Sequence, residues 1–169
     1  MRYAYYAKLE PRQKAIYRRS DEVAKLTLRN RAALSSLVDR LDGALASEQR
    51  AGIERASQRL ADAITASFEV PPVRVRVLST RPSTSSSELH GLYETGDRRT
   101  AAVIRLWMRT AHHKRVVAFR TFLRTLLHEL CHHLDYELLA LPDSFHTEGF
   151  FKRESSLVKQ LVGRSTLRR

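Results

Sequence analysis

Apolar residues in the first part of the chain recur at the spacing of helices. Residues 12–67 contain no proline, and their leucine, isoleucine and valine side chains return at steps of three and four positions, which predicts amphipathic helices. We expect breaks near residues 29–30 and 43–48, with Ser47 as the cap at the start of a new helix. Residues 1–69 are therefore predicted to form a helical N-terminal region, in which a helical hairpin covers a sheet or packs on another helix.

After Pro71 and Pro72 the apolar period falls to two, because every second residue is a valine and those between are arginines. This alternation predicts a half-buried strand. A loop over residues 81–87 follows, and two more strands are expected over residues 88–94 and 100–109. The sequence thus predicts a small, partly antiparallel sheet. We favour the strand over residues 100–109 as the exposed edge, with the strand over residues 88–94 as the alternative.

From Val116 onward the helical period returns. Phenylalanine and leucine side chains form one apolar stripe that ends near Leu139, and a last helix is expected from about Glu148 to Val162. Strands and helices in separate blocks predict the α+β fold class, with a small sheet packed on the long helix. Residues 70–169 form the predicted domain, and together with the N-terminal region they are expected to make one compact unit, since a chain of 169 residues can bury a single core.

The long helix contains the candidate chemistry. Residues 128–132 read His-Glu-Leu-Cys-His, an HExxH motif whose two histidines stand at i and i+4 on one helical face. We expect these imidazoles to converge on a single Zn²⁺, with Glu129 placed to act as general base on a water molecule at the metal. His128 and His132 share the polar face of the helix, whereas His133 falls on the apolar side and is expected to be structural.

A catalytic zinc site requires a third protein ligand, which must come from another segment. His146, beyond the loop that follows the helix, is the leading candidate, and Glu148 and Glu154 are the alternatives. Asp135 is expected to hold a ligand imidazole in its tautomer, because three ligands on one straight helix converge poorly on a tetrahedral ion. Cys131 points away from both motif histidines and is expected to be a packed thiol.

The order of these elements resembles the SprT-like zinc metallopeptidases, a family of the zincin fold. The resemblance rests on residues 128–132 and on His-Thr-Glu-Gly-Phe-Phe at residues 146–151, within a stretch from about residue 70 to residue 162. It implies a zincin-like domain that binds zinc and cleaves polypeptides, sometimes near DNA. The family's zinc ligands and base correspond to His128, His132, His146 and Glu129.

The predicted function is therefore zinc-dependent hydrolysis of peptide bonds, with Zn²⁺ as cofactor, a protein or peptide as substrate and Glu129 as general base. Two alternatives stay open. One is a catalytically latent protein of the same fold that binds or regulates others, and the second is a basic nucleic-acid-binding protein with incidental metal affinity. Four side chains are candidates for stabilising the oxyanion: Tyr93, His112, His113 and Tyr136.

Charge and composition bear on partners and location. The chain has 30 lysines and arginines against 18 aspartates and glutamates, a net charge of +12, which makes nonspecific contact with nucleic acid a second hypothesis. Eight of the basic residues lie between Asp97 and Glu129, where no acidic residue occurs. The single cysteine and the lack of a long apolar run predict a cytoplasmic protein without a signal peptide or membrane contact. Nothing in the sequence indicates the oligomeric state.

Overall fold

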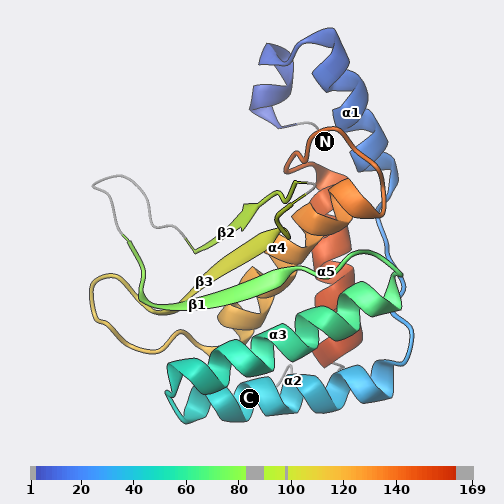
Figure 1. The fold of residues 1–169 in the computed structure, drawn as a ribbon. Helices are drawn as coiled ribbons and strands as arrows, with labels where there is room; N and C mark the ends of the chain where they lie inside the picture. Colours follow the sequence, from blue (N-terminus) through green and yellow to red (C-terminus); the bar gives the residue numbers. More distant parts are fainter. Residues whose placement is uncertain (1–2, 83–89, 98, 163–169) are drawn as a thin grey trace.

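The computed structural model describes residues 3–82, 90–97 and 99–162. It has the α+β fold class that the sequence predicts (Figure 1). Of the helices in these residues, none is both long and apolar enough to cross a bilayer. The elements in chain order are a 3-10 helix η1 (Ala4–Lys8), α1 (Pro11–Glu22), α2 (Arg31–Ala46), α3 (Arg50–Ser67), β1 (Arg74–Thr80), β2 (Gly91–Glu94), β3 (Val103–Arg109), α4 (Phe119–Glu137) and α5 (Glu148–Val162).

The three strands form a mixed sheet in the order β1-β3-β2, with β3 parallel to β1 and antiparallel to β2. The prediction that residues 100–109 form a sheet edge is therefore wrong, and the alternative, β2, is an edge strand. Leu106, Trp107 and Met108 are all buried, so β3 is covered on both faces as a central strand is. Residues 88 and 89 of the predicted second strand, and residues 83–87 of the predicted loop, lie outside the described residues.

Helices α2 and α3 pack on each other, and α3 also packs along β1, so the predicted hairpin does cover the sheet. The prediction that Ser47 starts a new helix is wrong. Its hydroxyl donates to the Ala44 carbonyl at 2.7 Å and it ends α2. The reason is that the chain reverses one residue later, at Glu48, whose backbone is left-handed with a φ of 54°.

Side chains of α3 cover the outer edge of β1. The Gln58 amide accepts from the Val75 N–H at 2.7 Å and donates to the Val73 carbonyl at 2.9 Å. The Glu54 carboxylate accepts from the Val77 N–H at 2.9 Å. These bonds take the place of a fourth strand, so this edge is closed to further strand pairing.

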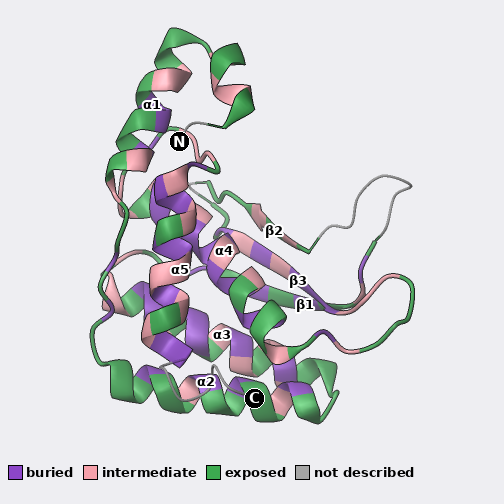
Figure 2. Cartoon of the chain, turned by 180° about the vertical axis from the view of Figure 1, so that it is seen from behind, coloured by how far each residue is buried: buried purple, intermediate pink, exposed green. Residues whose placement is uncertain are grey.

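One hydrophobic core joins the elements. Buried residues run without a break from α2 and α3 through the sheet to α4 and α5, and Figure 2 shows the buried faces of α4 and α5 turned toward the other elements. Helix α1 lies apart from α2 and α3, packed against α5 and close to the loop of residues 138–147 (Figure 1). This loop, which we call the 138–147 loop, leads from α4 into α5.

Candidate metal centre

Helix α4 positions the two motif histidines. Its leucine stripe is buried, as predicted, and this fixes the rotation of the helix about its axis. His128 and His132 consequently lie at the border of the core, half-buried, one helical turn apart, with ring centroids separated by 5.1 Å. His133 faces the core instead and is hydrogen-bonded to the Tyr93 hydroxyl and the Pro71 carbonyl, which confirms its structural role.

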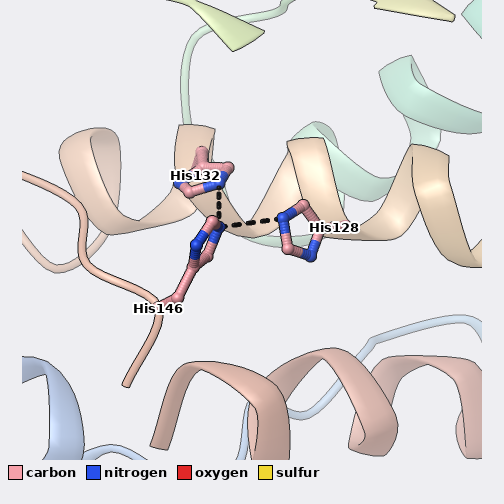
Figure 3. A group of neighbouring side chains, drawn as sticks. All are labelled: His128, His132 and His146. Carbon is pink, nitrogen blue, oxygen red and sulfur yellow. Dashed lines mark hydrogen bonds between the residues drawn. The ribbon is translucent and has the colours of Figure 1, made fainter. Parts of the chain in front are cut away.

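The 138–147 loop brings His146 to the same place. Ala140 has a left-handed backbone with a φ of 48° just after α4 ends, and the chain turns back there. The Nε2 atom of His146 lies 3.0 Å from Nε2 of His128 and 3.0 Å from Nε2 of His132 (Figure 3). Within the described residues these three histidines are the group whose ligand atoms all lie close enough to hold one metal ion, within 4.8 Å of one another.

The other ring nitrogen of His128 is held by α5. Glu154 of that helix is buried, and its Oε2 lies 2.9 Å from Nδ1 of His128. Its second oxygen pairs with Arg124 at 3.3 Å. Glu154 was an alternative for the third ligand, but it contacts the side of the His128 ring that faces away from the cluster. It therefore orients this imidazole instead of joining the ligand group.

The other ring nitrogen of His132 is held through a chain of three polar residues. Nδ1 of His132 lies 2.7 Å from the Ser144 hydroxyl, which lies 2.8 Å from Oδ2 of Asp135. Oδ1 of Asp135 in turn accepts from Arg153 at 2.6 Å, and both side chains of this ion pair are fully buried. Asp135 was predicted to contact a ligand imidazole, but it reaches the ring through the serine.

These outer contacts determine which nitrogen atoms carry lone pairs. A carboxylate only accepts, so Nδ1 of His128 holds the proton and its Nε2 a lone pair. Ser144 donates to Asp135 and accepts from Nδ1 of His132, so that ring also presents an Nε2 lone pair. Both lone pairs face Nε2 of His146, which has at most one proton to give. A cation among the three atoms satisfies all of them, and three imidazoles with an open fourth position are a donor set suited to catalytic Zn²⁺.

The electrostatics of the histidines agree with this fit. Burial, with the charges of His128 and His146, lowers the pKa of His132 to about 3. Burial also lowers the pKa of His146, again with a contribution from His128. Both imidazoles are therefore neutral at pH 7, the form in which a histidine binds a metal ion.

Glu129 lies beside the three histidines under the edge strand. Its side chain is buried, and burial raises its pKa to about 7 against the lowering effect of His128 and of the Tyr93 backbone. Strand β2 passes so close that a Cβ on Gly91 would lie 2.5 Å from Oε1 of Glu129. Glycine at this position therefore allows the strand to cover the carboxyl group.

A pocket of about 590 Å³ opens in front of the cluster. It is bounded on one side by Gly91 through Thr95 of the edge strand and its continuation, and on the other by Tyr136 and Ser144. All three histidines and Glu129 contribute to its wall. Of the four candidates for stabilising an oxyanion, Tyr93 and Tyr136 line this pocket, whereas His112 and His113 do not.

The remaining sequence candidates lie elsewhere. Glu148, the second alternative ligand, pairs with Lys152 on the surface of α5 at 2.8 Å. Cys131 is fully buried, and burial raises the pKa of its thiol, so the prediction of a packed thiol is confirmed. Neither residue belongs to the group of three histidines.

The predicted basic flank is partly neutralised. Arg105 pairs with Glu94, Arg109 with Glu48 and Arg124 with Glu154. Arg98 lies outside the described residues. Contact with nucleic acid stays a prediction.

Sequence reasoning missed three residues that support the site. Ser144 lies in a loop with no pattern to single it out, and Arg153 is a charged residue on the buried face of α5, between Phe150 and Leu157. Tyr5, more than 140 positions before His146, donates from its hydroxyl to the His146 carbonyl at 2.8 Å. The position of Arg153 on the apolar stripe of α5 is the one local signal among the three. Their partners could not be predicted, because each contact depends on segments that only the fold brings together.

A comparison of the chain with protein-family models, with curated proteins and with solved structures finds no match.

Proposed function

We propose that the protein is a zinc-dependent peptidase of the SprT-like, zincin type. The observation that carries the proposal is the convergence of three Nε2 atoms within 4.8 Å, at the wall of a pocket that also contains the Glu129 carboxyl. The HExxH spacing, the buried partners behind His128 and His132 and the open pocket all support the same chemistry.

Zn²⁺, when bound by the three histidines, supplies a Lewis acid that polarises a carbonyl and lowers the pKa of water. Glu129 takes the proton from the attacking water and passes it to the amine that leaves when the peptide bond breaks. The carboxyl is well placed for this role because β2 and α4 shield it from bulk solvent while its pocket side stays accessible. Tyr136 lines the same pocket, where its hydroxyl is a candidate to donate to the developing oxyanion. The Tyr93 hydroxyl instead donates to Nδ1 of His133, whose Nε2 donates to the Pro71 carbonyl.

The two sheet edges support a polypeptide as substrate. Gln58 and Glu54 close the outer edge of β1, whereas the outer edge of β2 borders the pocket. An extended peptide that pairs with Gly91–Glu94 by strand addition lies directly across the histidine cluster. A small compact substrate has no extended backbone with which to pair with this edge.

Measurement of bound zinc tests the metal-binding part of the proposal. The parent protein, His128→Ala and His146→Ala are purified without added zinc, and bound metal is measured by mass spectrometry. We expect one zinc ion per parent chain and a loss of zinc in both variants. A parent chain that takes up no zinc even when it is offered contradicts the proposal.

Glu129→Gln separates catalysis from metal binding. It keeps the volume of the side chain but removes the base, so we expect bound zinc to persist while hydrolysis of a denatured protein substrate falls by about 100-fold or more. Glu137→Gln, an exposed position on the same helix, is the matched control and should retain full activity. Equal activity of both variants would show that Glu129 is not the base.

A further inference from the structure

The segment of residues 145–149, which carries His146, makes many of its tertiary contacts with residues near the start of the described chain. We call residues 3–22, comprising η1 and α1, the N-terminal segment. The Tyr5 hydroxyl donates to the His146 carbonyl at 2.8 Å. The rings of Tyr17 and Phe145 lie 6.4 Å apart, and Tyr17 is fully buried.

Two more contacts fix the residues that follow His146. The hydroxyls of Ser20 and Thr147 are hydrogen-bonded at 3.3 Å, and both residues are fully buried. The carboxylate of Asp21 accepts from the Gly149 N–H at 2.7 Å, at the first turn of α5. The N-terminal segment thus contacts residues before, at and after His146.

The packing at Gly149 is too close for a side chain. A Cβ there would lie 2.6 Å from the Asp21 carbonyl oxygen and 2.7 Å from its Cα. Backbone atoms cannot turn aside as a flexible side chain can, so α1 and the start of α5 are in direct backbone contact. The position of the 145–149 segment is therefore set by the position of α1.

A second connection runs from α1 to His132. Nη1 of the buried Arg153 donates to the carbonyls of Ser20 and Val23, at the end of α1, and Nη2 donates to Asp135. Asp135 supports His132 through Ser144. Two of the three histidines are thus held by contacts that depend on the N-terminal segment.

We propose that the N-terminal segment assembles the metal centre, and that Tyr5 is a positioning residue for His146. Through its hydrogen bond to the His146 carbonyl, Tyr5 fixes the peptide group of the third ligand and favours the conformation in which the imidazole faces His128 and His132. This inference rests on the proposed zinc site. When a smaller fraction of molecules holds His146 in place, the apparent dissociation constant for zinc rises by the same factor.

Tyr5→Phe tests the inference because it removes only the hydroxyl. Tyr3→Phe is the matched control, since Tyr3 lies in the same segment and contacts Tyr5 and Phe151 through its ring. Zinc dissociation constants are measured by competition with a chromophoric chelator, and melting temperatures are measured on the metal-free proteins. The loss of one hydrogen bond should raise the zinc dissociation constant of Tyr5→Phe about fivefold. The zinc dissociation constant of Tyr3→Phe should equal that of the parent.

The outcomes separate the inference from the function on which it rests. Equal zinc affinity of Tyr5→Phe and the parent overturns the inference alone, and a parent that binds no zinc overturns both. If Tyr5 were merely structural, Tyr5→Phe would lower the melting temperature of the metal-free protein and leave the zinc dissociation constant unchanged, which also overturns the inference.

Cobalt provides a second measurement that does not depend on activity. The visible absorption of Co²⁺ reports its coordination geometry, so a displaced His146 should change the spectrum of Tyr5→Ala, in which both ring and hydroxyl are lost. Because His146→Ala is expected to lose the metal, its Co²⁺ spectrum is that of the free ion, and we expect the Tyr5→Ala spectrum to move from that of the parent toward that of the free ion. A Tyr5→Ala spectrum identical to that of the parent overturns the inference, and if this variant fails to fold, Tyr5→Phe decides alone.

Discussion

His128 and His132 stand on a helix whose buried stripe fixes their direction, whereas His146 stands in a loop whose position depends on a segment more than 120 residues away. The first two rings are oriented through their own side-chain nitrogens, by Glu154 and by Ser144. The third is held through its backbone carbonyl. The direct contacts of the two helix-borne histidines come from α5 and the adjoining loop, and α1 reaches His132 only through Arg153, Asp135 and Ser144. The loop-borne histidine is contacted by the N-terminal segment directly.

Arg153→Met should have the largest effect on stability, because Arg153 connects α1, which supports the His146 segment, with Asp135, which supports His132. Arg153 donates to the end of α1 and to Asp135, and its side chain is fully buried. Removal leaves the Asp135 carboxyl buried without its partner, which we expect to lower the free energy of unfolding by about 3–5 kcal/mol. Urea denaturation measures this. Lys152→Met, at an exposed neighbouring position, is the control and should leave the free energy of unfolding almost unchanged.

Gly149→Ala disturbs the segment that carries His146 and leaves the direct contacts of His128 and His132 in place. The new Cβ meets the backbone of Asp21, so α1 must move away from α5. We expect a loss of about 1–3 kcal/mol in the free energy of unfolding, together with weaker zinc binding. Gly43→Ala provides the control, since a Cβ on Gly43 in α2 meets nothing within 4 Å. It should stabilise the protein slightly, because alanine favours a helix. Similar effects of the two variants would count against close contact between α1 and α5.

Ser144→Ala weakens the support of His132, one of the two motif histidines on α4. It removes the link between His132 and Asp135 and leaves the Nδ1 proton of His132 without its acceptor. We expect the zinc dissociation constant to rise about tenfold, as is common when a group that orients a ligand is lost. Ser36→Ala on the exposed surface of α2 is the control. Unchanged zinc affinity in Ser144→Ala would mean that packing alone orients His132.

The smallest effect is expected when the native protein is treated with a reagent that alkylates Cys131. This residue lies between the motif histidines, yet it is fully buried and burial raises the pKa of its thiol. We expect no alkylation of the native protein by iodoacetamide, and full alkylation in denaturant. Mass spectrometry distinguishes the two results. Rapid labelling of the native protein would show that α4 opens readily around the three histidines.

Much of the helix-borne half of the site is encoded locally. The HExxH spacing and the leucine stripe of α4 predict both the convergence of His128 and His132 and the burial of His133. His146 was the leading candidate for the third ligand because it follows a turn back toward α4, and the geometry favours it over Glu148 and Glu154. The strand alternation likewise predicts β1, since Val75 and Val77 are buried while Arg74 and Arg76 are exposed.

The features that sequence reasoning missed are long-range. The prediction that residues 100–109 form the sheet edge was wrong because β3 pairs in parallel with β1 across a long connection, and no local pattern reports which strand becomes central. The cap at Ser47 was wrong because the left-handed residue, Glu48, comes one position later. Tyr5 and Arg153 act on the site only after α1 has packed against α5. Their roles follow from tertiary contacts and from nothing in their immediate sequence.

The contact between α1 and the start of α5 also sets the order of events during synthesis. Residues 3–22 leave the ribosome early but find Phe145, Thr147 and Gly149 only after almost all of the described chain has been made. The core of α2, α3 and the sheet can condense before then, since domains fold as their segments emerge. The pocket acquires its last histidine when α5 docks, so a nascent chain carries an incomplete histidine cluster until then.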